Sequence, residues 1–126
     1  MTIATALFAS ILCGGVFVSA QDGSTPALAC NLKAIASAER PRYNDLMKSL
    51  RASVRERTEH SSGYAFKLDG GAIGLKEVAE WISMERLCCP FLRFELSVSG
   101  YQAAWTLTLT GPLGAKAILE EEFPAP

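Results

Sequence analysis

The sequence has few of the residue types that common catalytic and metal-binding motifs require. His60 is its only histidine, so no two histidines can bind one metal ion. The chain also has no C-x-x-C pair, phosphate-binding loop, nucleophile elbow or catalytic carboxylate dyad. These absences favour a protein that is not an enzyme, without deciding the question.

The chain also has no large excess of charge of either sign. Twelve lysine and arginine residues stand against thirteen aspartate and glutamate residues, for a net charge of -1. Such a balance gives no strong overall field to attract nucleic acid or a membrane surface. We therefore expect no nucleic-acid partner and, for the mature domain, no membrane partner. A length of 126 residues with 49% hydrophobic residues allows one folded core.

Charged side chains are absent from residues 1–21, most of which are apolar. The small residues Val18-Ser19-Ala20 precede a polar stretch that begins at Gln21. This pattern is typical of a secretory signal peptide, here residues 1–20, cleaved after Ala20. The segment Met1-Thr2 has no basic residue, which leaves an uncleaved anchor or a start codon placed too far upstream as alternatives. We expect a secreted or periplasmic protein; a misplaced start would make it cytoplasmic.

The rest of the chain divides into a linker, residues 21–28, and a single α+β domain, residues 29–126. Apolar residues recur at steps of three and four from about Pro41 to Arg57, which predicts a helix with one buried stripe. A second helix is expected from about Gly74 to Pro90, because proline cannot continue a helix.

Alternating apolar and polar residues predict three strands. One contains Tyr64, Phe66 and Leu68, and two more, residues 92–98 and 105–109, flank a turn at Gly100 as an antiparallel hairpin. A last short helix is expected to run to about Glu122. The order is thus α-β-α-β-β-α. We expect the first two strands to pair in parallel by a right-handed crossover, giving a two-layer sandwich with a three-stranded sheet and helices on one face.

The cysteines are the most informative residues. Cys13 falls in the signal peptide, which leaves Cys30, Cys88 and Cys89 in the mature chain. Three converging thiolates suit a soft metal ion or thiol-reactive species, such as zinc, copper(I), mercury(II) or trivalent arsenic. The first hypothesis is therefore an exported domain that binds such a species through these three cysteines. His60 is a candidate fourth ligand, although a lone histidine near a helix end is more often a surface residue.

Two other uses of the same cysteines stay open. Buried cysteines pack as small hydrophobic residues, and Cys30 can form a disulfide with one member of the pair; the chain would then be a structural or protein-interaction module. Redox catalysis is disfavoured, because Cys88 lies at a helix C-terminus, whose negative partial charge opposes a thiolate. Since Pro90 holds Cys89 extended, we predict that Cys88 and Cys89 are not bonded to each other.

The segment from Glu85 to Phe94 reads Glu-Arg-Leu-Cys-Cys-Pro-Phe-Leu-Arg-Phe. It resembles an E-R-x-C-C-P-F-x-x-F segment in a family of small, largely uncharacterised bacterial proteins, and the resemblance spans about Ala29 to Leu119. It is also similar to Cys-Cys-Pro-Phe tails of some metal-responsive regulators. The resemblance implies that Cys30 belongs with the cysteine pair and favours soft-metal or thiol binding, but it implies no activity. The exported start departs from the usual cytosolic pattern of that family.

Overall fold

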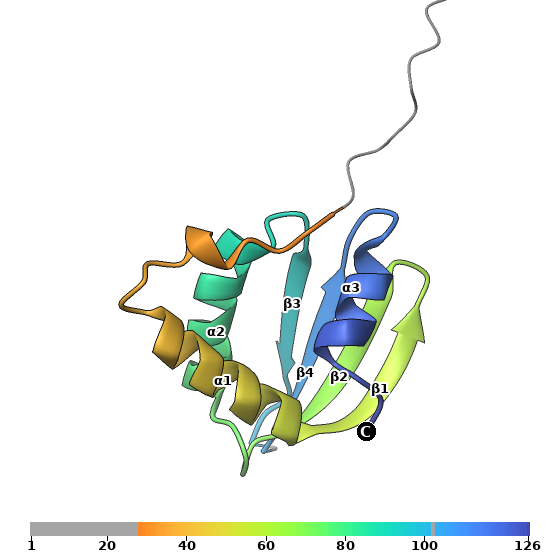
Figure 1. Cartoon of the computed structure of the whole chain (residues 1–126). Coiled ribbons are helices and arrows are strands. Elements are labelled where there is room, and N and C mark those ends of the chain that lie inside the picture. The colour runs from red at the N-terminus through yellow and green to blue at the C-terminus, as the bar shows by residue number, and fades with distance from the viewer. Residues whose placement is uncertain (1–27, 102) are drawn as a thin grey trace, which may run out of the picture.

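The protein is an α+β domain, as predicted, in a computed structural model that describes residues 28–101 and 103–126 (Figure 1). The expected signal peptide, and the expected linker except for its last residue, lie outside the described residues. Within these ranges, no helix has the length and apolar character needed to cross a membrane. The elements in chain order are the 3-10 helix η1 (Leu32–Ala34), α1 (Arg40–Ser53), β1 (Val54–His60), β2 (Gly63–Asp69), α2 (Leu75–Cys88), β3 (Arg93–Val98), β4 (Ala104–Thr110) and α3 (Ala115–Glu122).

The sheet has four strands in the order β1-β2-β4-β3, and every neighbouring pair is antiparallel. The expected three-stranded sheet with a parallel pair is therefore wrong. Strands β2 and β3 do run in the same direction, since both are antiparallel to β4. However, β2 and β3 are not neighbours. Helix α2 connects them across a gap of one strand, and β4, the second strand of the hairpin, fills that gap.

Strand β1 is the element that the sequence pattern missed. The first helix ends at Ser53, not near Arg57, and the chain continues directly as β1. The register places Arg57 opposite Phe66 and Glu59 opposite Tyr64, so charged side chains occupy the face where the neighbouring strand is apolar. The Arg57 guanidinium lies 4.7 Å from the centre of the Tyr64 ring. Because β1 has no apolar alternation, periodicity could not identify it as a strand.

The other strands show the predicted alternation. Apolar residues stand opposite one another in rows across β2, β4 and β3, namely Tyr64–Leu109–Phe94 and Phe66–Leu107–Leu96. The polar residues of β3, from Arg93 to Ser97, are exposed as predicted. Val98 continues the apolar series of this alternation, which predicts a buried side chain, but it is 43% exposed, because it ends an edge strand just before the turn at Gly100.

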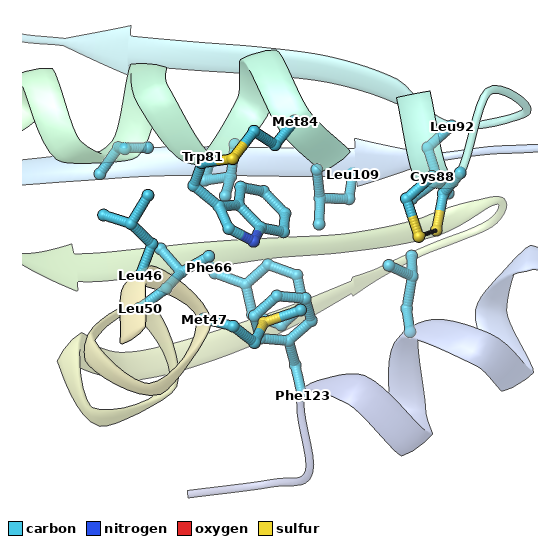
Figure 2. Close-up of a cluster of buried hydrophobic side chains, with 14 of the residues drawn as sticks. Leu46, Met47, Leu50, Phe66, Trp81, Met84, Cys88, Leu92, Leu109 and Phe123 are labelled. Atoms are coloured by element: carbon cyan, nitrogen blue, oxygen red, sulfur yellow. Dashed lines mark hydrogen bonds between the residues drawn. The ribbon is translucent and has the colours of Figure 1, made fainter. Parts of the chain in front are cut away.

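All three helices cover one face of the sheet, so the two-layer arrangement is confirmed (Figure 1). Aromatic side chains fill the space between the layers (Figure 2). The Trp81 ring on α2 lies 6.1 Å from the ring of Phe94 and 6.0 Å from that of Phe123, measured between centroids. Phe123 in turn lies 4.8 Å from Phe66 on β2. These edge and tilted contacts join α2, the end of α3 and the sheet into one core.

Candidate functional site at the end of helix α2

The start of the described chain is fastened to the last turn of α2. Cys30 and Cys89, 59 residues apart in sequence, form a disulfide. The backbone N–H of Asn31 also donates a hydrogen bond to the carbonyl oxygen of Cys88, at 2.9 Å. The Asn31 side chain accepts from the N–H of Lys33 and caps η1. The disulfide and these hydrogen bonds hold residues 30–34 against the end of α2.

Pro90 determines how the two adjacent cysteines are presented. Helix α2 ends at Cys88, and Cys89 has φ −119° and ψ 70°, outside the helical region, as expected for a residue that precedes proline. The Cys89 sulfur is therefore bonded to that of Cys30. Cys88, like Trp81 and Met84, is one of the buried residues of α2 (Figure 2). The Sγ atoms of Cys88 and Cys89 are 3.9 Å apart. The prediction that these two are not bonded to each other is confirmed.

The structure brings the three predicted cysteines together. The Sγ atoms of Cys30, Cys88 and Cys89 all lie within 4.8 Å of one another. They form a disulfide and one thiol, not three free thiols. Cys88 is 1% exposed, and burial, followed by the nearby charges of Glu85 and Glu122, raises the pKa of its thiol to about 11. His60 is exposed at the end of β1 and belongs to neither group of converging ligand atoms found in the described residues.

A buried glutamate beside the sulfurs was not predicted from the sequence. Glu85 is fully buried, and its Oε2 accepts a hydrogen bond of 2.6 Å from the hydroxyl of Tyr43 on α1. Its other oxygen, Oε1, has no hydrogen-bond partner among the described residues. Burial raises the pKa of Glu85, and burial together with this hydrogen bond raises the pKa of Tyr43. The two side chains form a polar group inside the helical layer.

A second acid, Glu122 at the end of α3, lies next to the first. Its Oε2 is buried and, like Oε1 of Glu85, has no partner in the described part of the chain. Burial and then the charge of Glu85 raise the pKa of Glu122 to about 7. One carboxylate oxygen from each of Glu85 and Glu122 lies within 4.8 Å of the other and of the Sγ atoms of Cys30 and Cys89. Two sulfurs and two carboxylates thus converge on one point.

A hollow of about 470 Å³ opens beside this cluster. Its lining combines apolar, acidic and basic side chains from the N-terminal segment, α1, α2 and α3, namely Cys30, Leu32, Tyr43, Asn44, Met47, Lys48, Arg51, Cys88 and Glu122. Lys48 and Arg51 are exposed on α1, and Nε of Arg51 donates to the backbone carbonyl of Glu122 at 2.6 Å. The hollow therefore has cations on its α1 side and sulfur and carboxylate groups on the opposite side.

One sequence signal could have identified Glu85 but none could have identified Glu122. Glu85 follows Trp81 by four positions and precedes Cys88 by three, so all three lie on the same face of a helix. A polar residue within a buried stripe is therefore visible from spacing alone. Glu122 is one of three consecutive glutamates near the C-terminus, and only the packing of α3 against the rest of the fold distinguishes it from the other two.

Comparisons with known proteins provide no function that can be carried over to this chain. A scan against protein-family models, a search of curated proteins and a search of solved structures found no match. The resemblance of the segment from Glu85 to Phe94 to a bacterial family therefore stays a prediction. The function has to be inferred from the geometry of the site itself.

Proposed function

We propose that this chain is an exported, non-catalytic binding or interaction module whose Cys30–Cys89 disulfide is structural. The observation that supports the proposal is the state of the three cysteines: Cys30 and Cys89 are cross-linked, and Cys88 is a buried free thiol. A thiol with a pKa of about 11 is almost wholly protonated near neutral pH, and the thiol form is a poor nucleophile. This chemistry supports a cross-link in preference to a redox catalyst.

The place of the disulfide in the fold supports the same role. It closes a loop across 59 positions, and a cross-link of this kind typically stabilises a small domain by about 2–4 kcal/mol. It also holds Cys30 and Leu32 in position as one wall of the hollow. Disulfides persist in oxidising compartments, which supports the export expected from the N-terminal sequence. The volume of the hollow, about 470 Å³, is in the range of small-ligand sites.

Peptide mapping of the natively purified protein tests this proposal. We expect a cross-linked peptide that joins Cys30 to Cys89, and a Cys88 peptide that iodoacetamide modifies slowly in the folded protein and rapidly in denaturant. Cys88→Ser is the matched control, since it removes the free thiol and leaves the disulfide intact. A native protein in which Cys30 and Cys89 are both free, or in which Cys88 reacts as fast as an unfolded thiol, would refute the structural role.

A second candidate function concerns the reduced protein. We propose that its three thiols bind a soft ion such as copper(I), mercury(II) or trivalent arsenic, a role supported by the convergence of the three Sγ atoms within 4.8 Å. Titration of the reduced protein with mercury(II) should give one bound ion per chain, with binding weakened by serine at any one of the three cysteines. Unchanged binding by Cys30→Ser would exclude the three-sulfur site.

A further inference from the structure

We propose that reduction of the Cys30–Cys89 disulfide opens a zinc site whose ligands are the thiolates of Cys30 and Cys89 and the carboxylates of Glu85 and Glu122. This site shares two cysteines with the three-sulfur site but replaces Cys88 by two oxygen ligands. It rests on the disulfide pairing of the proposed function and does not require the three-sulfur site.

The geometry of the four ligand atoms supports the proposal. All four lie within 4.8 Å of one another, whereas bonds of ~2.0–2.3 Å to one tetrahedral zinc ion place ligand atoms about 3.3–3.8 Å apart. Once the disulfide is reduced, its two sulfurs must move apart to this spacing, and side-chain rotation can bring the other ligand pairs, which are at most 4.8 Å apart, closer by roughly 1 Å. The ligands come from three different segments, because Cys30 precedes η1, Glu85 and Cys89 belong to the end of α2, and Glu122 ends α3.

Unpartnered oxygens provide an independent reason to expect a cation at this point. Oε1 of the fully buried Glu85 and Oε2 of Glu122 are both buried without a hydrogen bond in the described residues. No salt bridge reaches either carboxylate within residues 28–101 and 103–126. Arg51, whose charge acts on both acids, directs its Nε to a backbone carbonyl instead. Buried carboxylate oxygens that no hydrogen bond satisfies are costly, and a divalent cation between them removes that cost.

The mixed ligand set selects the class of metal. Hard ions such as magnesium and calcium take oxygen ligands and do not favour thiolates. The softest ions prefer sulfur alone, and the three-sulfur arrangement serves them better. Zinc accepts thiolate and carboxylate ligands in one tetrahedral site. Four protein ligands fill its coordination sphere, so the site is of the structural type and leaves no open position for a substrate.

The redox state of the disulfide controls whether the site exists. A thiol reductant gives two electrons to the Cys30–Cys89 bond and is itself oxidised to its own disulfide, and its two protons go to the freed sulfurs. Zinc binding then displaces both protons from the two thiols, because the thiolate is the ligand form. In the disulfide state neither sulfur carries a negative charge, so only the two carboxylates are available. The same protein is thus cross-linked by a disulfide when oxidised and by zinc when reduced.

The experiment compares zinc affinity of the oxidised and reduced full chain by competition with a chromophoric chelator. The reduced sample is prepared with a phosphine, which becomes a phosphine oxide and is removed under nitrogen. We expect one zinc per reduced chain and a raised melting temperature, with no comparable binding by the oxidised chain. Glu85→Gln and Glu122→Gln should each weaken binding by about tenfold or more. Glu121→Gln, an exposed neighbour on α3, and Cys88→Ser should leave it unchanged.

Substitution of cobalt(II) for zinc separates this site from the three-sulfur site. The intensity of its thiolate charge-transfer band counts the bound sulfurs, and we expect the intensity of two. An intensity of three, lost in Cys88→Ser and retained in Glu122→Gln, would refute the zinc site while supporting the three-sulfur candidate. Equal zinc affinity of oxidised and reduced chains would refute the zinc site, whereas the three-sulfur candidate is tested separately by the mercury(II) titration. If Glu85→Gln fails to fold, Glu122→Gln with its Glu121→Gln control still decides the result.

Discussion

Helix α2 buries its middle and its last turn in chemically different ways. Around Val78 and Trp81 the buried face is apolar except for the indole N–H of Trp81, which has no partner in the described residues. Around Glu85 and Cys88 the same face carries a carboxylate and a thiol. The first region packs against aromatic rings and the second against Tyr43 and the sulfurs. One helix thus contributes to a core and to a polar site, and the energetic consequences differ.

The largest effect is expected in the apolar region. Trp81→Ala should lower the free energy of unfolding by about 3–5 kcal/mol, because it removes buried surface and leaves a cavity among the rings of Phe94 and Phe123. Urea denaturation followed by circular dichroism measures the change. Leu87→Ala is the matched control, since Leu87 lies on the same helix but is 46% exposed. Similar losses for the two variants would contradict the assignment of the core face.

In the polar region, Tyr43→Phe should have a smaller effect. Among the described residues it removes the one hydrogen bond to the buried Glu85 carboxylate, at almost constant volume. An unsatisfied buried group of this kind costs about 1–3 kcal/mol. The same urea titration applies. Tyr101→Phe serves as the control, because Tyr101 is fully exposed. A loss no larger than that of the control would mean that the hydrogen bond contributes nothing to folding.

The free energy of unfolding should depend on pH, because Glu122 is partly buried and its pKa is raised in the folded protein. Its pKa is about 7 in the folded protein against an ordinary 4.5, so the folded state keeps a proton that the unfolded state releases. Stability should therefore fall as the pH rises from about 4.5 to about 7, by roughly 1–3 kcal/mol after allowance for partial exposure. The groups that act on Glu122 are Glu85 on α2, Arg51 on α1 and the adjacent Glu121.

Melting temperatures measured across this interval, on the metal-free protein with its disulfide intact, provide the readout. Glu122→Gln should flatten the dependence and leave the melting temperature at low pH nearly unchanged. A wild-type protein that becomes more stable between pH 4.5 and 7 would contradict the predicted burial of this carboxylate.

The smallest effect is expected at Glu80, an acid on the outer side of α2. Its carboxylate forms a salt bridge of 2.7 Å with Arg42 on α1, which lowers the pKa of Glu80, the opposite direction from Glu85. Because this pair is exposed to water, Glu80→Gln should change the denaturation midpoint little. Glu85→Gln on the same helix is the comparison, and equal responses would show that burial does not distinguish the two acids.

Periodicity predicted those elements in which one face is apolar. Strand β2 and the β3–β4 hairpin were found because apolar residues alternate with polar ones, and the first helix was found because its apolar residues recur at steps of three and four. The end of α2 was predicted from Pro90. The first half of strand β1 was predicted as part of the first helix, because β1 has charged residues where an apolar alternation would be expected. Arg57 lies over the ring of Tyr64, and Glu59 forms a salt bridge with Lys116 on α3. The strand order depends on which long-range pairs form, and local sequence does not contain that information.

The sequence grouped the three cysteines of the candidate cluster, but it did not predict that two carboxylates join them. The three cysteines could be grouped because they are few, and the splaying of Cys88 and Cys89 followed from Pro90. The sequence left open whether Cys30 pairs with one of them, and geometry is needed to identify Cys89 as its partner. Glutamate is rarely buried. The helix spacing of Glu85 with Trp81 and Cys88 was the one available signal, and no local pattern indicated that Glu122 would lie next to it.

The bond between Cys30 and Cys89 also decides how the molecule would bear mechanical tension. A pull on the chain ahead of Cys30 passes through the sulfur atoms directly to Pro90 and β3, because the disulfide closes the chain between the two cysteines, a sequence separation of 59, into a ring. Helices α1 and α2 and strands β1 and β2 lie inside that ring and carry no load. At about 3.5 Å per residue, the disulfide shortens the fully extended chain by roughly 200 Å. Under force, only the β3–β4 hairpin and α3 can be extended while the disulfide is intact. The elements between Cys30 and Cys89 can be extended only after a reductant breaks the bond.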